Sequence, residues 1–190
     1  MLFKNGLIVA VVAQAAIAAP LQQHTTTLMV PADMPTIQEN VDKVLSGIDK
    51  IIGDIKAYSP EKKDLTALLA DSAAILSALA DGTTKIKASP ALGVADVLSI
   101  LTPVGSLDTK VADVASALKD KKADFEKGGQ IKDVLDQLQK QYAATIPFSK
   151  AITGSLPLPS VLGIIADPIA KGITDKLAGA VTDFGGTVPA

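Results

Sequence analysis

Apolar residues recur along this chain at helical spacing, in stretches separated by prolines and glycines. The first stretch begins at a capping box, in which Thr36 and Glu39 satisfy free backbone amides at a helix start. Its apolar residues then step by four and three, which predicts a helix with one narrow apolar stripe of the bundle type. Leu45 and Ile52 widen that stripe on one side. The stripe consists of Ile37, Val41, Val44, Ile48, Ile51 and Ile55.

Further helices are expected after each break. Ser59 and Pro60 have the residue types of a helix start, and Gly82 is a candidate for the end of that second helix. Pro103 should break or kink a later apolar run, and Pro168 should kink the last helix unless that helix begins there. The remaining segments are predicted at about 90–103, 104–126, 130–145 and 159–184, with a short helix or turn after residue 145.

Alternation of apolar and polar residues at period two is missing from the sequence, so no strand is predicted. The breaks fall every 15 to 25 residues. These patterns predict an all-α fold, an antiparallel bundle of five to six helices with short loops. We place this bundle domain at residues 36–184, followed by a C-terminal tail at 185–190.

The N-terminus is typical of a secretory signal peptide. Lys4 supplies the charge, an apolar run starts at Leu7, and "AIA" ending at Ala18 fits a cleavage site. A membrane anchor is the alternative, but the run is short and is followed by Pro20. We therefore expect a signal peptide at 1–18, a linker or propeptide at 19–35, no transmembrane segment, no GPI anchor, and an extracellular protein.

Composition narrows the class of function. The 190 residues are 48% hydrophobic but only 3% aromatic, with no Trp, and the formal net charge is −2. Such a chain offers neither the basic patch nor the stacking surface that nucleic acids require. Its basic residues are all Lys, so a bidentate guanidinium clamp is impossible. With no Cys, the core must hold the fold without disulfides.

Catalytic chemistry has little support in the sequence. The single His, His24, lies in the expected linker, and metal sites of the His/Cys type are excluded. The carboxylate pairs Asp120/Asp124 and Asp133/Asp136 each share a helix face, where a solvated surface is the ordinary interpretation and acid–base work the alternative. We therefore expect a protein that is not an enzyme and has no cofactor and no metal.

Two stretches resemble the fungal hydrophobic surface-binding protein A family, also described as cell-wall galactomannoproteins. The first is "VDKVLSGIDKIIGDIKAYS" with the Ala/Leu-rich segment after it. The second, residues 114–152, contains Leu118, Lys121, Lys122 and Phe125 in the pattern L-x-x-K-K-x-x-F before a small-residue break. The resemblance covers most of residues 36–184, while "SLPLPS" departs from the family pattern.

The resemblance implies a secreted helical protein that binds apolar material. Related domains enclose long-chain fatty acids in the bundle, and other members adsorb to hydrophobic surfaces, where a secreted esterase is the partner that the resemblance implies. The Ser/Thr-rich C-terminal stalk of wall-anchored members is missing from this sequence. That difference favours a released protein over one covalently attached to the cell wall.

A fatty-acid site would need an apolar wall and a donor for the carboxyl group. Ser72 and Tyr142 lie on apolar stripes, although Ser72 could instead bond the carbonyl four residues before it, and Tyr142 could be a rim residue. The segment 155–169 has a broad apolar arc that suits either a tunnel wall or ordinary core. The candidate ligand-binding residues are Ile48, Ile52, Leu68, Ser72, Leu98, Leu101, Leu138, Tyr142, Leu162, Ile165 and Ile169.

Three functions remain open at this point. The first is a carrier of fatty acids or similar ligands, which predicts an internal apolar cavity of several hundred Å³. The second is a surface-active structural protein that adsorbs to the cell wall or cuticle, which predicts a tightly packed core. The third is a secreted effector that acts on host membranes or proteins.

Overall fold

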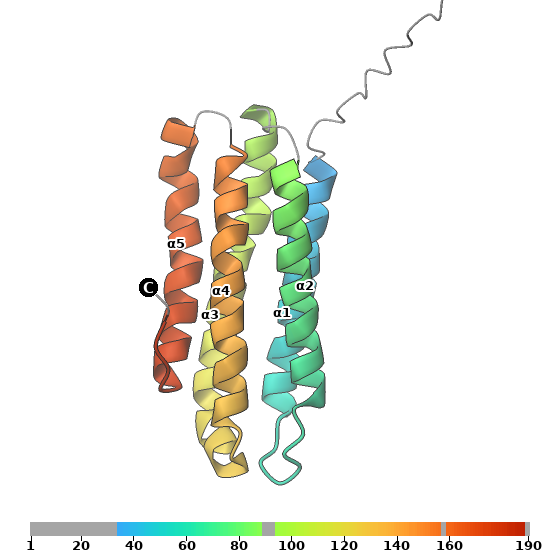
Figure 1. The fold of residues 1–190 in the computed structure, drawn as a ribbon, viewed down its shortest axis with the longest axis vertical. Coiled ribbons are helices and arrows are strands. Elements are labelled where there is room, and N and C mark those ends of the chain that lie inside the picture. The colour runs from blue at the N-terminus through green and yellow to red at the C-terminus, as the bar shows by residue number, and fades with distance from the viewer. Residues whose placement is uncertain (1–33, 89–93, 157–158, 189–190) are drawn as a thin grey trace, which may run out of the picture.

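Five α-helices make up the part of the chain that the structure describes (Figure 1). The computed structural model describes residues 34–88, 94–156 and 159–188, with their side chains except at 34–36, 94–101 and 159–165. No strand occurs in these ranges, and the predicted all-α bundle is confirmed. The helices are α1 (Met34–Ala57), α2 (Thr66–Ala88), α3 (Val94–Gly128), α4 (Ile131–Gly154) and α5 (Pro159–Asp183).

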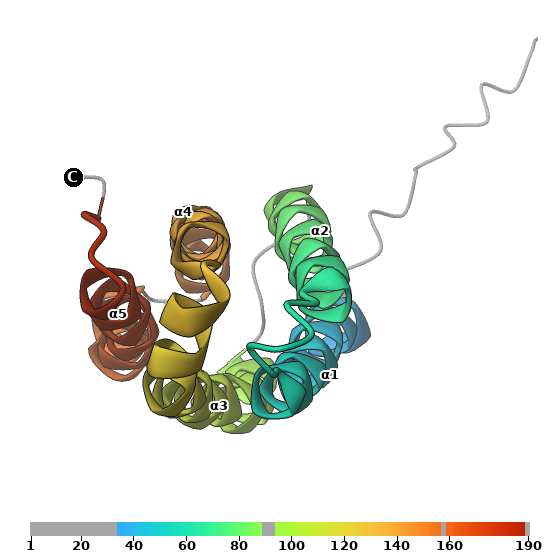
Figure 2. The same cartoon turned by 90° about the horizontal axis from the view of Figure 1, so that it is seen from below.

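The helices are arranged as a ring rather than around a central helix. Consecutive helices run in opposite directions, and the view along the bundle shows α1, α3 and α5 in one row with α2 and α4 in a second (Figures 1 and 2). The contacts link α1 to α2, α2 to α4, α4 to α5, α5 to α3, and α3 back to α1. The consecutive helices α3 and α4 barely touch. The pairs α1/α3, α2/α4 and α3/α5 are consequently parallel neighbours.

Three prolines lie inside helices, at positions where the sequence suggested breaks or kinks. Helix α3 continues through Pro103 over 35 residues, and α4 continues through Pro147 to Gly154. Helix α5 likewise passes Pro168. The separate helices expected at 90–103 and 104–126, and the short element after residue 145, are therefore wrong. A proline removes one backbone hydrogen bond, and packing against neighbours on both sides of the ring offsets that cost.

The predicted bounds of the second helix are wrong at both ends. Residues 58–65 form a loop, in which the Ser59 hydroxyl donates to Glu61 instead of capping a helix. The helix starts where Asp64 Oδ1 accepts the Thr66 backbone N–H at 2.9 Å. It then runs through Gly82, where an added Cβ would lie 2.7 Å from Phe148 Cε2. Gly82 thus allows α2 to approach α4 closely and does not end a helix.

The apolar stripe of α1 is confirmed, because all six of its predicted members are buried. The helix begins at Met34, two residues before the expected capping box, whose side chains at Thr36 and before are not described. The predicted signal peptide lies outside the described residues. So does the expected linker, apart from Met34 and Pro35.

Candidate lipid-binding lumen

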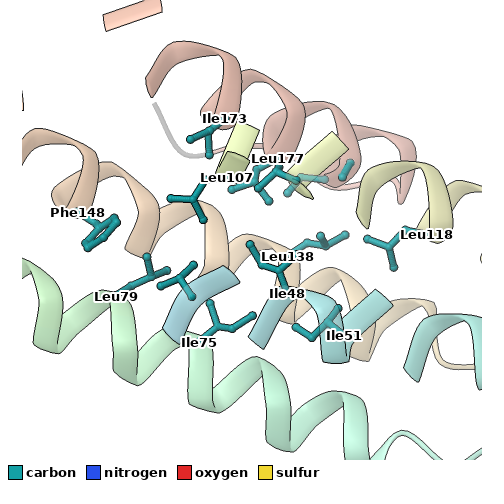
Figure 3. Close-up of a cluster of buried hydrophobic side chains, with 14 of the residues drawn as sticks. Ile48, Ile51, Ile75, Leu79, Leu107, Leu118, Leu138, Phe148, Ile173 and Leu177 are labelled. Carbon is teal, nitrogen blue, oxygen red and sulfur yellow. The ribbon is translucent and has the colours of Figure 1, made fainter. Parts of the chain in front are cut away.

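A ring of five helices leaves space along its axis. Neighbouring helix axes in proteins lie about 9 Å apart, so five of them stand on a circle with a radius of about 8 Å. No backbone reaches the centre of such a ring, and side chains must fill it. Here they leave a cavity of about 110 Å³ between the helices. We call this space the lumen. Its walls come from all five helices (Figure 3).

Four of the five helices give the lumen an almost wholly aliphatic wall. The stripe of α1 faces it, as do branched side chains of α2, α3 and α5. Ala166 and Ala170 are small, so α5 lines part of the lumen with little side-chain volume. The aliphatic lining is Val44, Ile48, Ile51 and Ile55 from α1; Leu68, Ile75 and Leu79 from α2; Val104, Leu107, Val111, Val114 and Leu118 from α3; and Ile173 and Leu177 from α5.

Helix α4 differs from the others because polar side chains line the lumen along its length. They recur at every fourth residue, a spacing that keeps them on one face of a helix. Val134, Leu138, Phe148 and Ile152 lie beside them and complete this part of the wall. The polar residues are Gln137, Gln141, Thr145, Ser149 and Thr153.

The polar residues meet α2 at Ser72, whose side chain is 2% exposed. Gln141 Nε2 donates to the Ser72 backbone carbonyl at 3.0 Å and to Ser72 Oγ at 3.1 Å. Ser72 Oγ in turn donates to Gln137 Oε1 at 3.1 Å. A backbone carbonyl only accepts, so the bond to the Ser72 carbonyl fixes the orientation of the Gln141 amide, and the Ser72 hydroxyl, which accepts from Gln141, donates its own proton to Gln137 Oε1. The Ser72 hydroxyl therefore joins a network between two helices and does not bond within its own.

Three buried aromatic side chains pack together beyond one end of the lumen lining. Tyr58 stacks on Phe125 with ring centroids 4.4 Å apart, and Phe184 lies 6.3 Å from Phe125. All three are buried. Burial, and then the carboxylates of Asp124 and Glu61, raise the pKa of the Tyr58 hydroxyl, so it stays neutral. We call these three side chains, which include the buried Tyr58 hydroxyl with no hydrogen-bond partner among the described residues, the aromatic plug.

The structure places the candidate residues in three groups. Ile48, Leu68, Ser72 and Leu138 line the lumen together. Ile52, Tyr142 and Ile169 pack half-buried against the core, outside this lining. The side chains of Leu98, Leu101, Leu162 and Ile165 lie outside the described residues.

Sequence reasoning missed Gln137 and Gln141. It followed apolar residues only, and therefore continued the stripe of α4 from Leu138 to Tyr142. The buried face instead turns through Thr145 and Phe148. The signal was present in the sequence as polar residues at a strict spacing of four, parallel to an apolar stripe.

Charged groups are kept out of the lumen. No Lys, Asp or Glu is among the residues that line it in the described part of the chain. Asp120, Asp133 and Asp136 are exposed, and Asp124 accepts a hydrogen bond from Lys121 at 3.0 Å. In the same ranges no cluster of His, Asp or Glu could hold a metal ion, and no helix is apolar enough over sufficient length to cross a membrane.

A known protein family matches most of the described chain. The family model for hydrophobic surface binding protein A matches residues 34–154. The chain belongs to this family. The matched range covers α1 to α4, whereas α5 lies beyond it.

Curated relatives are cell wall proteins of fungi. The chain is 28% identical over 181 residues to cell wall mannoprotein 1 of Talaromyces marneffei, covering 95% of this chain and 37% of the relative. It is 33% identical over 111 residues to cell wall mannoprotein 1 of Aspergillus fumigatus, covering 58% of this chain and 38% of that protein. The chain therefore spans less than half the length of these two relatives.

Solved structures share the fold. Ligand binding domain 1 of the Penicillium marneffei MP1 protein, complexed with arachidonic acids, superposes with a TM-score of 0.75 at 23% identity and covers 80% of this chain and 98% of its own. Ligand binding domain 2, complexed with multiple arachidonic acids, gives 0.75 at 24%, covering 83% and 99%. AFMP4P in complex with palmitic acid gives 0.68 at 23%, covering 80% and 99%.

Proposed function

We propose that this protein is a secreted, non-enzymatic carrier that binds long-chain fatty acids or similar apolar ligands in the lumen. The observation that carries the proposal is the ring of five helices around a lumen lined almost entirely by aliphatic side chains. The structural neighbours described as complexes with arachidonic or palmitic acid support it. Extracellular location and association with the cell wall are proposed from the cell wall mannoprotein relatives.

The free energy of such binding would come from the chain of the ligand. Each methylene transferred from water contributes roughly 0.8 kcal/mol before ordering costs, so a long acyl chain binds without any specific polar contact. The lumen of about 110 Å³ is smaller than the several hundred Å³ expected for a ligand site. Binding therefore requires the Leu and Ile side chains of the wall to rotate, or neighbouring helices to separate.

Native mass spectrometry and thermal melting test the carrier function. Protein from its own host should carry bound lipid, and added palmitate should raise its melting temperature. Leu138→Trp fills the lumen and should abolish that rise, whereas Leu135→Trp, whose side chain does not line the lumen, is the matched control. The absence of both lipid and thermal shift in the native protein would contradict the proposal.

A second candidate function, adsorption to hydrophobic surfaces, is favoured by the description of the family itself. Val188, at 36% exposure, is the large apolar side chain exposed among the described residues, so the closed bundle presents almost no adsorbing surface. Adsorption would therefore require the ring to open and expose the lumen wall. It would bring the protein beside secreted esterases, our proposed partners on such surfaces.

Binding to beads distinguishes the two functions. A surface-active protein should be depleted by alkyl-coated beads and not by hydrophilic beads, whereas a carrier whose ring stays closed should be recovered equally from both. Equal recovery from both bead types would rule out adsorption and leave the carrier function unaffected.

A further inference from the structure

The polar network formed by Ser72, Gln137 and Gln141 lies far from the end of the lumen that Thr153 lines. Twelve residues of α4 separate Gln141 from Thr153, which is about 18 Å along a helix. In the other direction Leu68 and Val134 lie only one to two turns from the network, above the aromatic plug. A ligand group seated at Ser72 therefore has the longer part of the lumen on its Thr153 side, and the Gln137 and Gln141 side chains beside it are half-buried.

Charge at this position has nothing to compensate it. The lining residues of the described chain include no Lys, and the sequence has no Arg. Moving an ionised carboxylate from water into an apolar site costs far more than moving its neutral form, and such groups take up a proton instead. A carboxylate ion is thus a poor occupant of this lumen.

The network has one free donor group and one free acceptor. Gln137 uses its Oε1 to accept from Ser72, and no hydrogen bond from its amide N–H groups is found among the described residues. Gln141 uses its Nε2 to donate to Ser72, which leaves its Oε1 without a protein donor there. Gln137 and Gln141 are one helical turn apart on α4. Together they suit a ligand group that both donates and accepts.

We infer that the lumen selects ligands whose polar group is uncharged, namely a protonated carboxylic acid, an alcohol or a primary amide, and seats that group on Gln137 and Gln141. This inference rests on the proposed carrier function and adds the chemical class of the head group to it. A fatty acid would enter in its neutral form and would take up a proton from solution on binding at neutral pH.

A set of twelve-carbon probes tests the inference in calorimetric titrations below their micelle concentrations. The set is 1-dodecanol, dodecanamide, dodecanoic acid and dodecane-1-sulfonate, whose chains are matched. We expect the affinity for the alcohol and the affinity for the amide each to stay constant as the pH changes, because neither probe carries a charge. The affinity for dodecanoic acid should fall about tenfold for each pH unit above the ordinary carboxyl pKa of about 4 to 5, because only the neutral form binds. The sulfonate should bind at least tenfold more weakly than the alcohol.

Two variants connect the selectivity to the network. Gln137→Leu removes the free donor and should lower the affinity for the alcohol and the amide about five- to tenfold. Gln137→Lys adds a cation and should raise the affinity for the sulfonate at least tenfold. Gln139→Leu is the matched control, because Gln139 lies on the same helix and donates to the Thr187 carbonyl outside the lumen. Circular dichroism verifies that each variant folds.

The outcomes separate the inference from the proposed function. If the sulfonate binds as tightly as the alcohol, or dodecanoic acid binds independently of pH, the head-group inference is overturned while the carrier function stands. Unchanged binding of all four probes by a folded Gln137→Leu protein would also overturn it. Binding of none of the probes by the native protein would overturn the carrier function and the inference together.

Discussion

A pair of carboxylates, Asp54 of α1 and Asp71 of α2, lies where these two helices pack together. Asp54 Oδ2 is buried and has no hydrogen-bond donor among the described residues. Burial, and then the neighbouring carboxylate of Asp71, raise the pKa of Asp54 above its ordinary value of 3.8. The charged form of Asp54 therefore destabilises the folded state, by desolvation and by repulsion.

The contribution of Asp54 to the stability of the protein should consequently increase as the pH falls through the folded-state pKa of Asp54. Because that pKa is raised, the folded state binds this proton more tightly than the unfolded state does, and the contribution of Asp54 levels off below pH 3.8. Asp54→Asn should increase the free energy of unfolding at pH 7 by up to about 1 kcal/mol and so raise the melting temperature. The difference from the native protein should shrink toward pH 4.

Asp49 provides the contrast for this measurement. Its carboxylate accepts from Lys110 Nζ at 2.6 Å on the surface between α1 and α3. Asp49→Asn should therefore lower stability slightly, by less than about 0.5 kcal/mol, as for other exposed pairs. An Asp54→Asn protein that melts below the native protein at pH 7 would contradict the assignment of Asp54 as a repulsive group.

Glycines act differently on the helices according to what surrounds them. Gly82 lies where α2 approaches both α4 and α1, and an added Cβ would also lie 3.3 Å from Asn40 Cβ. Gly53 is an exposed residue inside α1, with nothing within 4 Å of an added Cβ. The same residue type thus allows a close helix contact at one position and only weakens a helix at the other.

Alanine substitutions at these two glycines should have opposite effects on stability. Gly53→Ala should stabilise the protein by about 0.5–1 kcal/mol, because alanine reduces the flexibility of the unfolded chain. Gly82→Ala should destabilise it by about 1–3 kcal/mol, because Phe148 would have to move in a packed interior. Denaturant unfolding measures both changes.

A second substitution identifies the cause at Gly82. Phe148→Leu removes the ring atoms that an alanine would meet, so the two changes together should cost less than the sum of their separate costs. Simple additivity in this double-mutant cycle would show that the Gly82–Phe148 contact is not the source of the loss.

At the scale of the molecule, α5 closes the ring. It packs against both α3 and α4, which barely touch each other. Without α5, the ring would therefore be open between α3 and α4. Ala166, Ala170, Ile173 and Leu177 of α5 form one side of the lumen. Lys176 also pairs with Asp108 of α3 across this interface. The helix beyond the range matched by the family model therefore forms part of the lumen wall.

Truncation after residue 156 tests this role of α5. The shortened protein should expose the aliphatic wall of the lumen to water, lose its cooperative melting transition, and associate in size-exclusion chromatography. A truncated protein that melts like the full chain and still binds palmitate would show that four helices suffice for the fold and the site.

The sequence by itself determined the features that depend only on residues close together in the chain and on composition. The stripe of α1 required only the helical period, and the aliphatic composition already favoured apolar contacts over nucleic acid. Prolines misled the prediction because their cost is local, whereas the gain that offsets it comes from neighbours across the ring. Gly82 misled it for the same reason, since a glycine in one helix cannot reveal a phenylalanine 66 residues later.

Only the tertiary structure decided that the five helices close into a ring and enclose a lumen. Helical periodicity reports which face of each helix is buried, but it does not report which helices become neighbours. The network of Ser72 with Gln137 and Gln141 joins residues more than 60 positions apart. Its polar members were visible in the sequence as a repeat of four. Their shared location in the lumen depends on the contact of α2 with α4, which no local pattern encodes.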